Sequence, residues 1–118
     1  MNTINVIFNR AVKNHQEGKT DIAQDLYNQV LKNNPNHSQA LNNLGIIFKG
    51  LGDNQKAKEC YEKAIEIDPN YVNALNNLGV IFKELGENQK AKDYFEKAIK
   101  INPNYADAHY NFGNIFKE

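Results

Sequence analysis

The chain has 118 residues, which is enough for one modest domain and too few for two ordinary ones. Its 14 basic and 14 acidic residues cancel, so no global field draws the chain toward nucleic acid or anionic lipid. The longest apolar runs, such as LGIIF, fall far short of the ~18 residues that suggest a membrane span. Composition therefore favours a folded protein with neither a nucleic-acid partner nor a membrane segment.

The N-terminal stretch MNTINVIFNRAVKNH mixes asparagine and arginine into its apolar run, unlike a secretory signal. Cys60 is the single cysteine, so it can neither close a disulfide within the chain nor build a multi-cysteine metal site. A cytoplasmic location is the expectation that follows.

A 34-residue unit recurs along the chain. Prolines fall only at positions 35, 69 and 103, and glycines at positions 18, 52 and 86 keep the same step. The predicted repeats are 4–37, 38–71 and 72–105, followed by a partial repeat at 106–118. The second and third units are identical at 24 of 34 positions. Self-similarity at this period predicts a stacked array of repeats.

The first unit departs from the later copies. Arg10 and Asn14 replace apolar residues of the later units, and Val30 stands where those units have alanine. A terminal unit has no neighbour on one side, so these changes are tolerable there. We nevertheless expect the first helix to pack less regularly than its later equivalents.

Each later unit contains two amphipathic helical stretches. In YVNALNNLGVIFKEL the apolar residues recur at three- and four-residue steps, and Gly86 is expected to end this helix. The next stretch, NQKAKDYFEKAIKI, should end before Asn102 and Pro103, because proline disfavours helix at its predecessor. Connections this short force the two helices to lie antiparallel.

Small residues should let the paired helices approach. Gly79, Ala91 and Ala98 carry little side chain, so helix axes can come close there. Larger apolar residues are expected to fill the space on either side, namely Leu75, Leu78, Phe82 and Phe95.

These small, aromatic and proline positions resemble the tetratricopeptide repeat (TPR) family, whose repeat is a 34-residue helix–turn–helix. The resemblance covers three full repeats plus the first helix of a fourth. It implies an all-α TPR solenoid forming a single domain, 1–118, wound as a right-handed superhelix. The concave face of such a superhelix is made mainly by the first helix of each pair.

One row of asparagines occupies equivalent places in the four first helices: Asn9, Asn43, Asn77 and Asn111. The resemblance places this row in the groove. It is similar to the asparagine ladder in the TPR region of O-linked N-acetylglucosamine transferases, where such residues hold the backbone of an extended peptide. A carboxamide offers both a donor and an acceptor, so it can pair with a peptide group without reading side chains. The alternative explanation is that the row consists of solvated polar residues that were copied with the repeat and bind no ligand, since 20 residues of the chain are asparagine.

Neighbouring rows complete the predicted groove. Further candidates for peptide contact are Asn42, Asn76, Asn73 and Gln39, with Lys49 and Lys83 expected along one wall. The predicted groove is therefore rich in amides, partly apolar and fringed by positive charge.

Another TPR function, the gripping of acidic chaperone tails, fits poorly. By resemblance, that clamp needs basic residues at the places of Phe8, Asn73 and Asn77, and asparagines at the places of Val12 and Asn43. Only Asn43 agrees.

Catalysis is disfavoured by the absence of converging reactive groups. The three histidines, His15, His37 and His109, are scattered without zinc-ligand spacing, and no glycine-rich phosphate loop occurs. The sequence thus predicts a non-catalytic scaffold, without cofactor or metal, that binds an extended peptide or a partner helix. Two alternatives stay open: homo-oligomerisation through uncapped repeat ends, and a TPR fragment of a larger enzyme.

Overall fold

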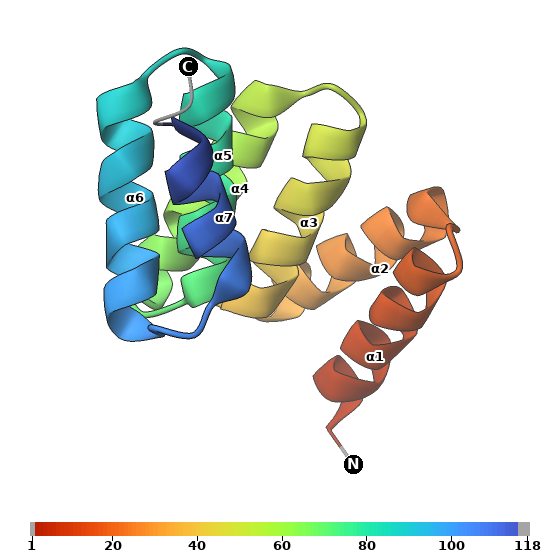
Figure 1. The fold of residues 1–118 in the computed structure, drawn as a ribbon. Helices are drawn as coiled ribbons and strands as arrows, with labels where there is room; N and C mark the ends of the chain where they lie inside the picture. Colours follow the sequence, from red (N-terminus) through yellow and green to blue (C-terminus); the bar gives the residue numbers. More distant parts are fainter. Residues whose placement is uncertain (1, 116–118) are drawn as a thin grey trace. The chain divides into compact units, whose positions relative to one another are not determined.

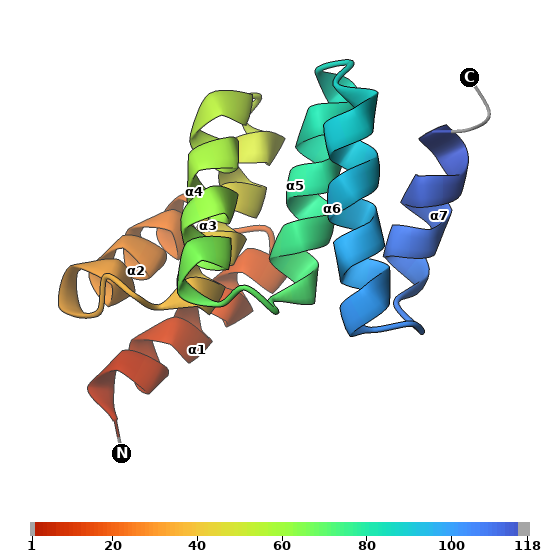
Figure 2. The same cartoon turned by 90° about the vertical axis from the view of Figure 1, so that its left-hand side faces the viewer.

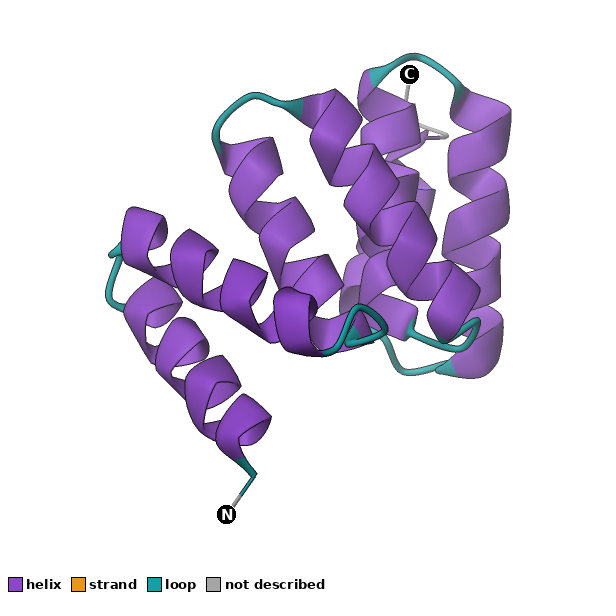
Figure 3. Cartoon of the chain, turned by 180° about the vertical axis from the view of Figure 1, so that it is seen from behind, coloured by secondary structure: helices purple, strands orange, loops and turns teal. Residues whose placement is uncertain are grey.

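The computed structural model describes residues 2–115, which form seven α-helices and no strand (Figures 1 and 3). The helices are α1 (Thr3–Gln16), α2 (Thr20–Asn33), α3 (Ser38–Gly50), α4 (Asn54–Ile67), α5 (Val72–Glu84), α6 (Asn88–Ile101) and α7 (Ala106–Ile115). The all-α prediction is confirmed for this part of the chain. The predicted partial repeat extends to 118, and its positions 116–118 lie outside the described residues.

The chain divides into two compact units, one up to Cys60 and the other from Tyr61 onward, with the boundary inside α4. In the first unit, α1 and α2 form an antiparallel hairpin, and α3 packs on α2 (Figure 1). The buried cluster of this unit comprises Ala11, Ala23, Leu26, Tyr27, Val30, Ala40, Leu44 and Ile47.

In the second unit, α5, α6 and α7 follow one another as antiparallel neighbours (Figure 2). Leu75, Ala98 and Ala108 form a buried cluster there, to which each of these three helices contributes one residue. In this unit α5 and α7 are the first helices of their repeats, and they also contact each other.

Glycine ends the first helix of each pair. Gly18, Gly52 and Gly86 have φ angles of 78°, 82° and 79°, a left-handed conformation that other residues adopt only with strain. The Gly86 N–H donates to the Lys83 carbonyl at 3.0 Å, which satisfies a backbone group of the last turn of α5. The predicted stop at Gly86 is confirmed.

The turns between repeats also share one design. Asn34, Asp68 and Asn102 each follow a second helix and precede a proline, and their Oδ1 atoms accept from the N–H two residues on at 3.1–3.2 Å. This local bond closes the turn that proline begins. As predicted, α6 ends at Ile101, just before Asn102 and Pro103.

Close approach of α5 and α6 depends on Gly79. A Cβ atom built at Gly79 would lie only 2.5 Å from Cε1 of Phe95, whereas real Cβ contacts begin beyond 3 Å. Ala91 and Ala98 on α6 are fully buried. The prediction that small residues let these helices approach is confirmed, and the fully buried Phe95 ring fills the space beside Gly79.

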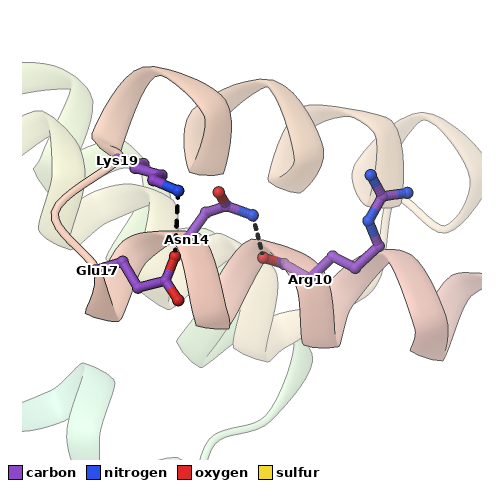
Figure 4. Close-up of polar contacts among 4 residues, drawn as sticks. All are labelled: Arg10, Asn14, Glu17 and Lys19. Carbon is purple, nitrogen blue, oxygen red and sulfur yellow. Dashed lines mark hydrogen bonds and ion pairs between the residues drawn. The ribbon is translucent and has the colours of Figure 1, made fainter.

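The first hairpin accommodates its departures from the later repeats (Figure 4). The Asn14 Nδ2 donates to the Arg10 carbonyl at 2.8 Å, so the amide bonds to its own helix while the Arg10 side chain stays exposed. Lys19 and Glu17 form an ion pair at 3.4 Å in the loop that follows. Val30 is fully buried, so the larger side chain is absorbed by the core.

Gly79→Ala should destabilise the chain by about 1–3 kcal/mol, because the added methyl group overpacks against Phe95. Gly113→Ala is the matched control, since Gly113 lies in α7 with nothing within 4 Å of an added Cβ. That change should stabilise the chain by about 0.5–1 kcal/mol through lower backbone entropy in the unfolded state. Urea unfolding followed by circular dichroism measures both, and equal effects at the two glycines would contradict the packing argument.

His37 makes stability depend on pH. Its Nδ1 atom caps α3 by accepting from the Ala40 N–H at 3.1 Å, which requires that nitrogen to be unprotonated. Burial lowers the pKa of His37, with a smaller opposing effect from a backbone hydrogen bond. The unfolded state then binds the proton more readily, so stability is complete above the unfolded pKa of about 6.5 and declines as the pH falls below it.

We therefore expect the melting temperature of the wild-type chain to fall more between about pH 7.5 and about pH 5.5 than that of His37→Asn. Asparagine caps helices well and does not titrate in this range. His15 and His109 remain in both proteins, so the comparison isolates residue 37. Parallel melting curves across the pH series would show that His37 contributes nothing.

Candidate functional site

Asn43 belongs to a polar network in the first unit. Its Oδ1 accepts from the Asn42 Nδ2 at 3.4 Å, and its side chain also hydrogen-bonds the Tyr27 hydroxyl. That hydroxyl oxygen lies 3.3 Å from Nδ1 of His15. Tyr27 is 0% exposed, so its polar atom must find partners inside the protein. The network joins α1, α2 and α3, and it includes Asn43 of the predicted row.

Burial raises the pKa of the Tyr27 hydroxyl, and the hydrogen bond with Asn43 opposes part of that rise. The hydroxyl therefore stays neutral and links His15 to Asn43 within the network.

A shallow, open pocket of about 260 Å³ lies over this network. Val12, His15 and Gln16 line it from α1, Tyr27 from α2 and Asn43 from α3. The lining combines one aliphatic side chain with amide, imidazole and hydroxyl groups, and it includes no carboxylate. Asn9 is exposed on α1 three residues before Val12, a spacing that puts both on the same side of the helix.

In the second unit, two hydrogen bonds join the predicted rows of α5 to the α7 segment. The Asn111 Nδ2 donates to the Asn76 Oδ1 at 3.1 Å, and the Tyr105 hydroxyl donates to the Asn73 Oδ1 at 2.6 Å. Burial raises the pKa of Tyr105, and the negative charge of Asp107 adds to the rise, which keeps this hydroxyl a neutral donor.

The predicted site residues differ in exposure. Asn9, Gln39 and Asn73 are exposed, whereas Asn43, Asn77, Asn111, Lys49 and Lys83 are half-buried. Asn42 and Asn76 are buried, with 2% and 5% of their surface exposed. The structure brings Asn42 together with Asn43, and Asn76 with Asn111, so each buried amide contacts a member of the predicted row.

Sequence reasoning missed the tyrosines that support these asparagines. Tyr27 aligns with Tyr61 and Phe95 in the repeat. The sequence therefore predicts an aromatic core residue at this position and no role for its hydroxyl. Tyr105 aligns with Tyr71 at the end of a repeat. The signal was the hydroxyl itself, because a buried tyrosine requires a polar partner.

Reactive clusters are absent from this region. Within residues 2–115, no group of three or more His, Cys, Asp and Glu side chains is arranged to hold a metal ion. Among the described helices, none combines the length and apolar character that crossing a bilayer requires. The arrangement offers hydrogen-bonding amides beside apolar surface, which is chemistry suited to binding.

A family model described as tetratricopeptide repeat matches residues 38–71 and again residues 72–105. Further tetratricopeptide repeat models match residues 16–49 and 94–118. The chain belongs to the tetratricopeptide repeat family. No curated protein matches it in sequence.

Solved structures share this TPR fold. The first TPR of Spaghetti (RPAP3), bound to the HSP90 peptide SRMEEVD, superposes with a TM-score of 0.89 at 21% identity, over 97% of this chain and 90% of that one. The Sgt2 TPR domain from Aspergillus fumigatus gives 0.89 at 23% identity, over 99% and 79%. MamA gives 0.83 at 30% identity; the match covers 98% of this chain but 63% of MamA.

Proposed function

We propose that this TPR protein is a non-catalytic interaction module that holds an extended segment of a partner protein by its main chain. Asn9 and Asn43 would make the contacts in the first unit, and Asn77 and Asn111 in the second. The observation that carries the proposal is the pocket of about 260 Å³, where Asn43 lies beside the aliphatic Val12. An amide next to apolar surface suits a peptide group and its adjoining side chain.

The amides keep hydrogen-bonding capacity for a ligand. A carboxamide has two N–H donors and an oxygen with two lone pairs. Asn43 makes two hydrogen bonds, with Asn42 and Tyr27, and Asn111 makes one with Asn76. Each amide therefore keeps hydrogen-bonding capacity for a peptide group. We also propose that this row acts like the asparagine ladder of O-linked N-acetylglucosamine transferases.

The charge of the site favours a neutral segment. The RPAP3 domain is bound to a peptide with an acidic end, SRMEEVD. Here Phe8, Asn73 and Asn77 stand where the clamp for such tails needs basic residues. The Phe8 ring instead packs against the rings of Tyr27 and His37, at centroid distances of 6.0 and 4.7 Å. We therefore propose a partner segment recognised through its backbone rather than through an acidic terminus, with Lys49 and Lys83 at the margin.

The test begins by selecting binders from a library of unstructured peptides on the wild-type chain. Asn43→Ala combined with Asn77→Ala should weaken a selected peptide about 10- to 100-fold, because each lost hydrogen bond contributes roughly 0.5–1.5 kcal/mol. Fluorescence anisotropy measures the affinities. N-methylation of the peptide backbone should also weaken binding, whereas most side-chain changes in the peptide should be tolerated.

A control variant accompanies this experiment. Asn28→Ala removes an exposed asparagine of α2, outside the predicted row. This control should bind within about twofold of wild type. Unchanged affinity in the Asn43/Asn77 double variant would overturn the proposal.

A second candidate function is self-association, favoured by Tyr110 on α7, whose large side chain is 70% exposed. This candidate predicts that the mass measured by light scattering rises with protein concentration, and that Tyr110→Ser reduces the rise by removing exposed apolar area. A chain that stays monomeric over the whole concentration series would eliminate it.

A further inference from the structure

Neighbouring asparagines on the first helices lie in two different environments. Asn76 on α5 has 5% of its surface exposed, whereas Asn111 on α7 is half-buried and belongs to the predicted row. The two side chains meet across 35 residues of sequence, with the Asn111 Nδ2 donating to the Asn76 Oδ1 at 3.1 Å. The buried amide thus accepts a hydrogen bond from the amide that reaches the surface.

We propose that Asn76 is a positioning residue that fixes the orientation of the Asn111 carboxamide. The inference rests on the proposed function, since it is Asn111 that would touch the partner's backbone. A surface carboxamide can rotate and can exchange the places of its oxygen and nitrogen. The acceptor offered by Asn76 selects the orientation in which the nitrogen of Asn111 faces inward and its oxygen remains for a ligand.

A second bond secures the same junction. The Tyr105 hydroxyl, just before α7, donates to the Asn73 Oδ1 on α5 at 2.6 Å. Asn73 and Asn76 are one helical turn apart, so two bonds fix the first turns of α7 against α5. These two bonds therefore fix the position of Asn111 relative to Asn76 along the two helices.

The first unit shows a related contact at Asn42, which lies 34 residues before Asn76. Asn42 has 2% of its surface exposed, and its Nδ2 donates to the Oδ1 of the half-buried Asn43 at 3.4 Å. These two asparagines are neighbours on α3, whereas Asn76 and Asn111 belong to different helices. In each unit a buried asparagine therefore contacts an asparagine of the predicted row, but only in the second unit does the bond join two helices.

The rival explanation is that Asn76 only fills space between α5 and α7. Two substitutions of similar size separate these roles. Asn76→Asp keeps the acceptor oxygen that Asn111 uses, whereas Asn76→Leu removes it and keeps an apolar filling. Positioning predicts that aspartate preserves the order of the Asn111 amide and leucine abolishes it. Simple packing predicts the reverse, because a buried carboxylate fits poorly and leucine fits well.

The experiment measures hydrogen exchange of the Asn111 side-chain amide by NMR on the full chain labelled with ¹⁵N. Asn76→Leu should speed this exchange about fivefold, the factor that one net hydrogen bond provides, and Asn76→Asp should leave it within about twofold. The Asn33 side chain, which donates to the Gln29 carbonyl at 2.9 Å on α2, is the internal control and should not change.

The wild-type chain supplies a test that needs no substitution and so does not depend on either variant folding. Of the two Asn111 Nδ2 protons, the one donated to Asn76 should exchange about fivefold more slowly. Equal rates for the two protons would overturn the proposal. So would Asn111 exchange that is unaffected by Asn76→Leu, or that responds equally to leucine and aspartate.

Peptide binding then separates this inference from the proposed function. With a selected peptide, Asn76→Leu should weaken binding about fivefold and Asn76→Asp should restore it, the rescue that a packing role does not predict. If the exchange results hold but no peptide binds, the proposed function fails and the positioning of Asn111 stands. If peptide binds while Asn111 is indifferent to residue 76, the positioning role alone fails.

Discussion

The close approach of paired helices is the constraint on which the rest of this structure depends. At Gly79 the backbone of α5 comes so near the Phe95 ring that one methyl group would overlap with it. The same ring is fully buried, as are Ala91 and Ala98 on the facing helix. Burial of an aromatic ring of this size contributes about 1.5–3 kcal/mol, which is available only if the partner helix presents no side chain at the contact. Packing of this kind fixes the rotation of each helix about its axis and thereby determines which residues reach the surface.

Local hydrogen bonds give the repeats a common geometry. The glycines after the first helices adopt positive φ angles within a few degrees of one another. The Asx turns after the second helices have nearly equal lengths, and each leads into a proline. Because these signals are encoded within a few residues, each hairpin receives the same local geometry at its turns. Equivalent residues of successive first helices therefore occupy equivalent places in their hairpins. The asparagines of the row can then make the same kind of contact in each hairpin.

The buried polar groups near that row need hydrogen-bond partners. Burial of an unpaired amide or hydroxyl lowers protein stability by about 1–3 kcal/mol. Among the described residues, no buried side-chain nitrogen or oxygen lacks a hydrogen bond. Asn42 and Asn76 meet this requirement by bonding to asparagines nearer the surface, and Tyr27 meets it through His15 and Asn43. The demand for partners inside the protein thus organises the amides that a ligand would meet.

The sequence by itself determined the helices, their ends and the contacts between paired helices, because each depends on residue types a short distance apart. Spacing identified Gly86 as a helix end and Gly79 as a close contact, and the 34-residue period placed Asn43 and Asn111 in one row. Only the tertiary structure decided the roles of individual asparagines. Adjacent residues on a helix point about 100° apart, so Asn42 is buried while Asn43 reaches the pocket. The partner of Asn111 lies 35 residues away, and hydrogen bonds over that separation are set by packing rather than by local pattern.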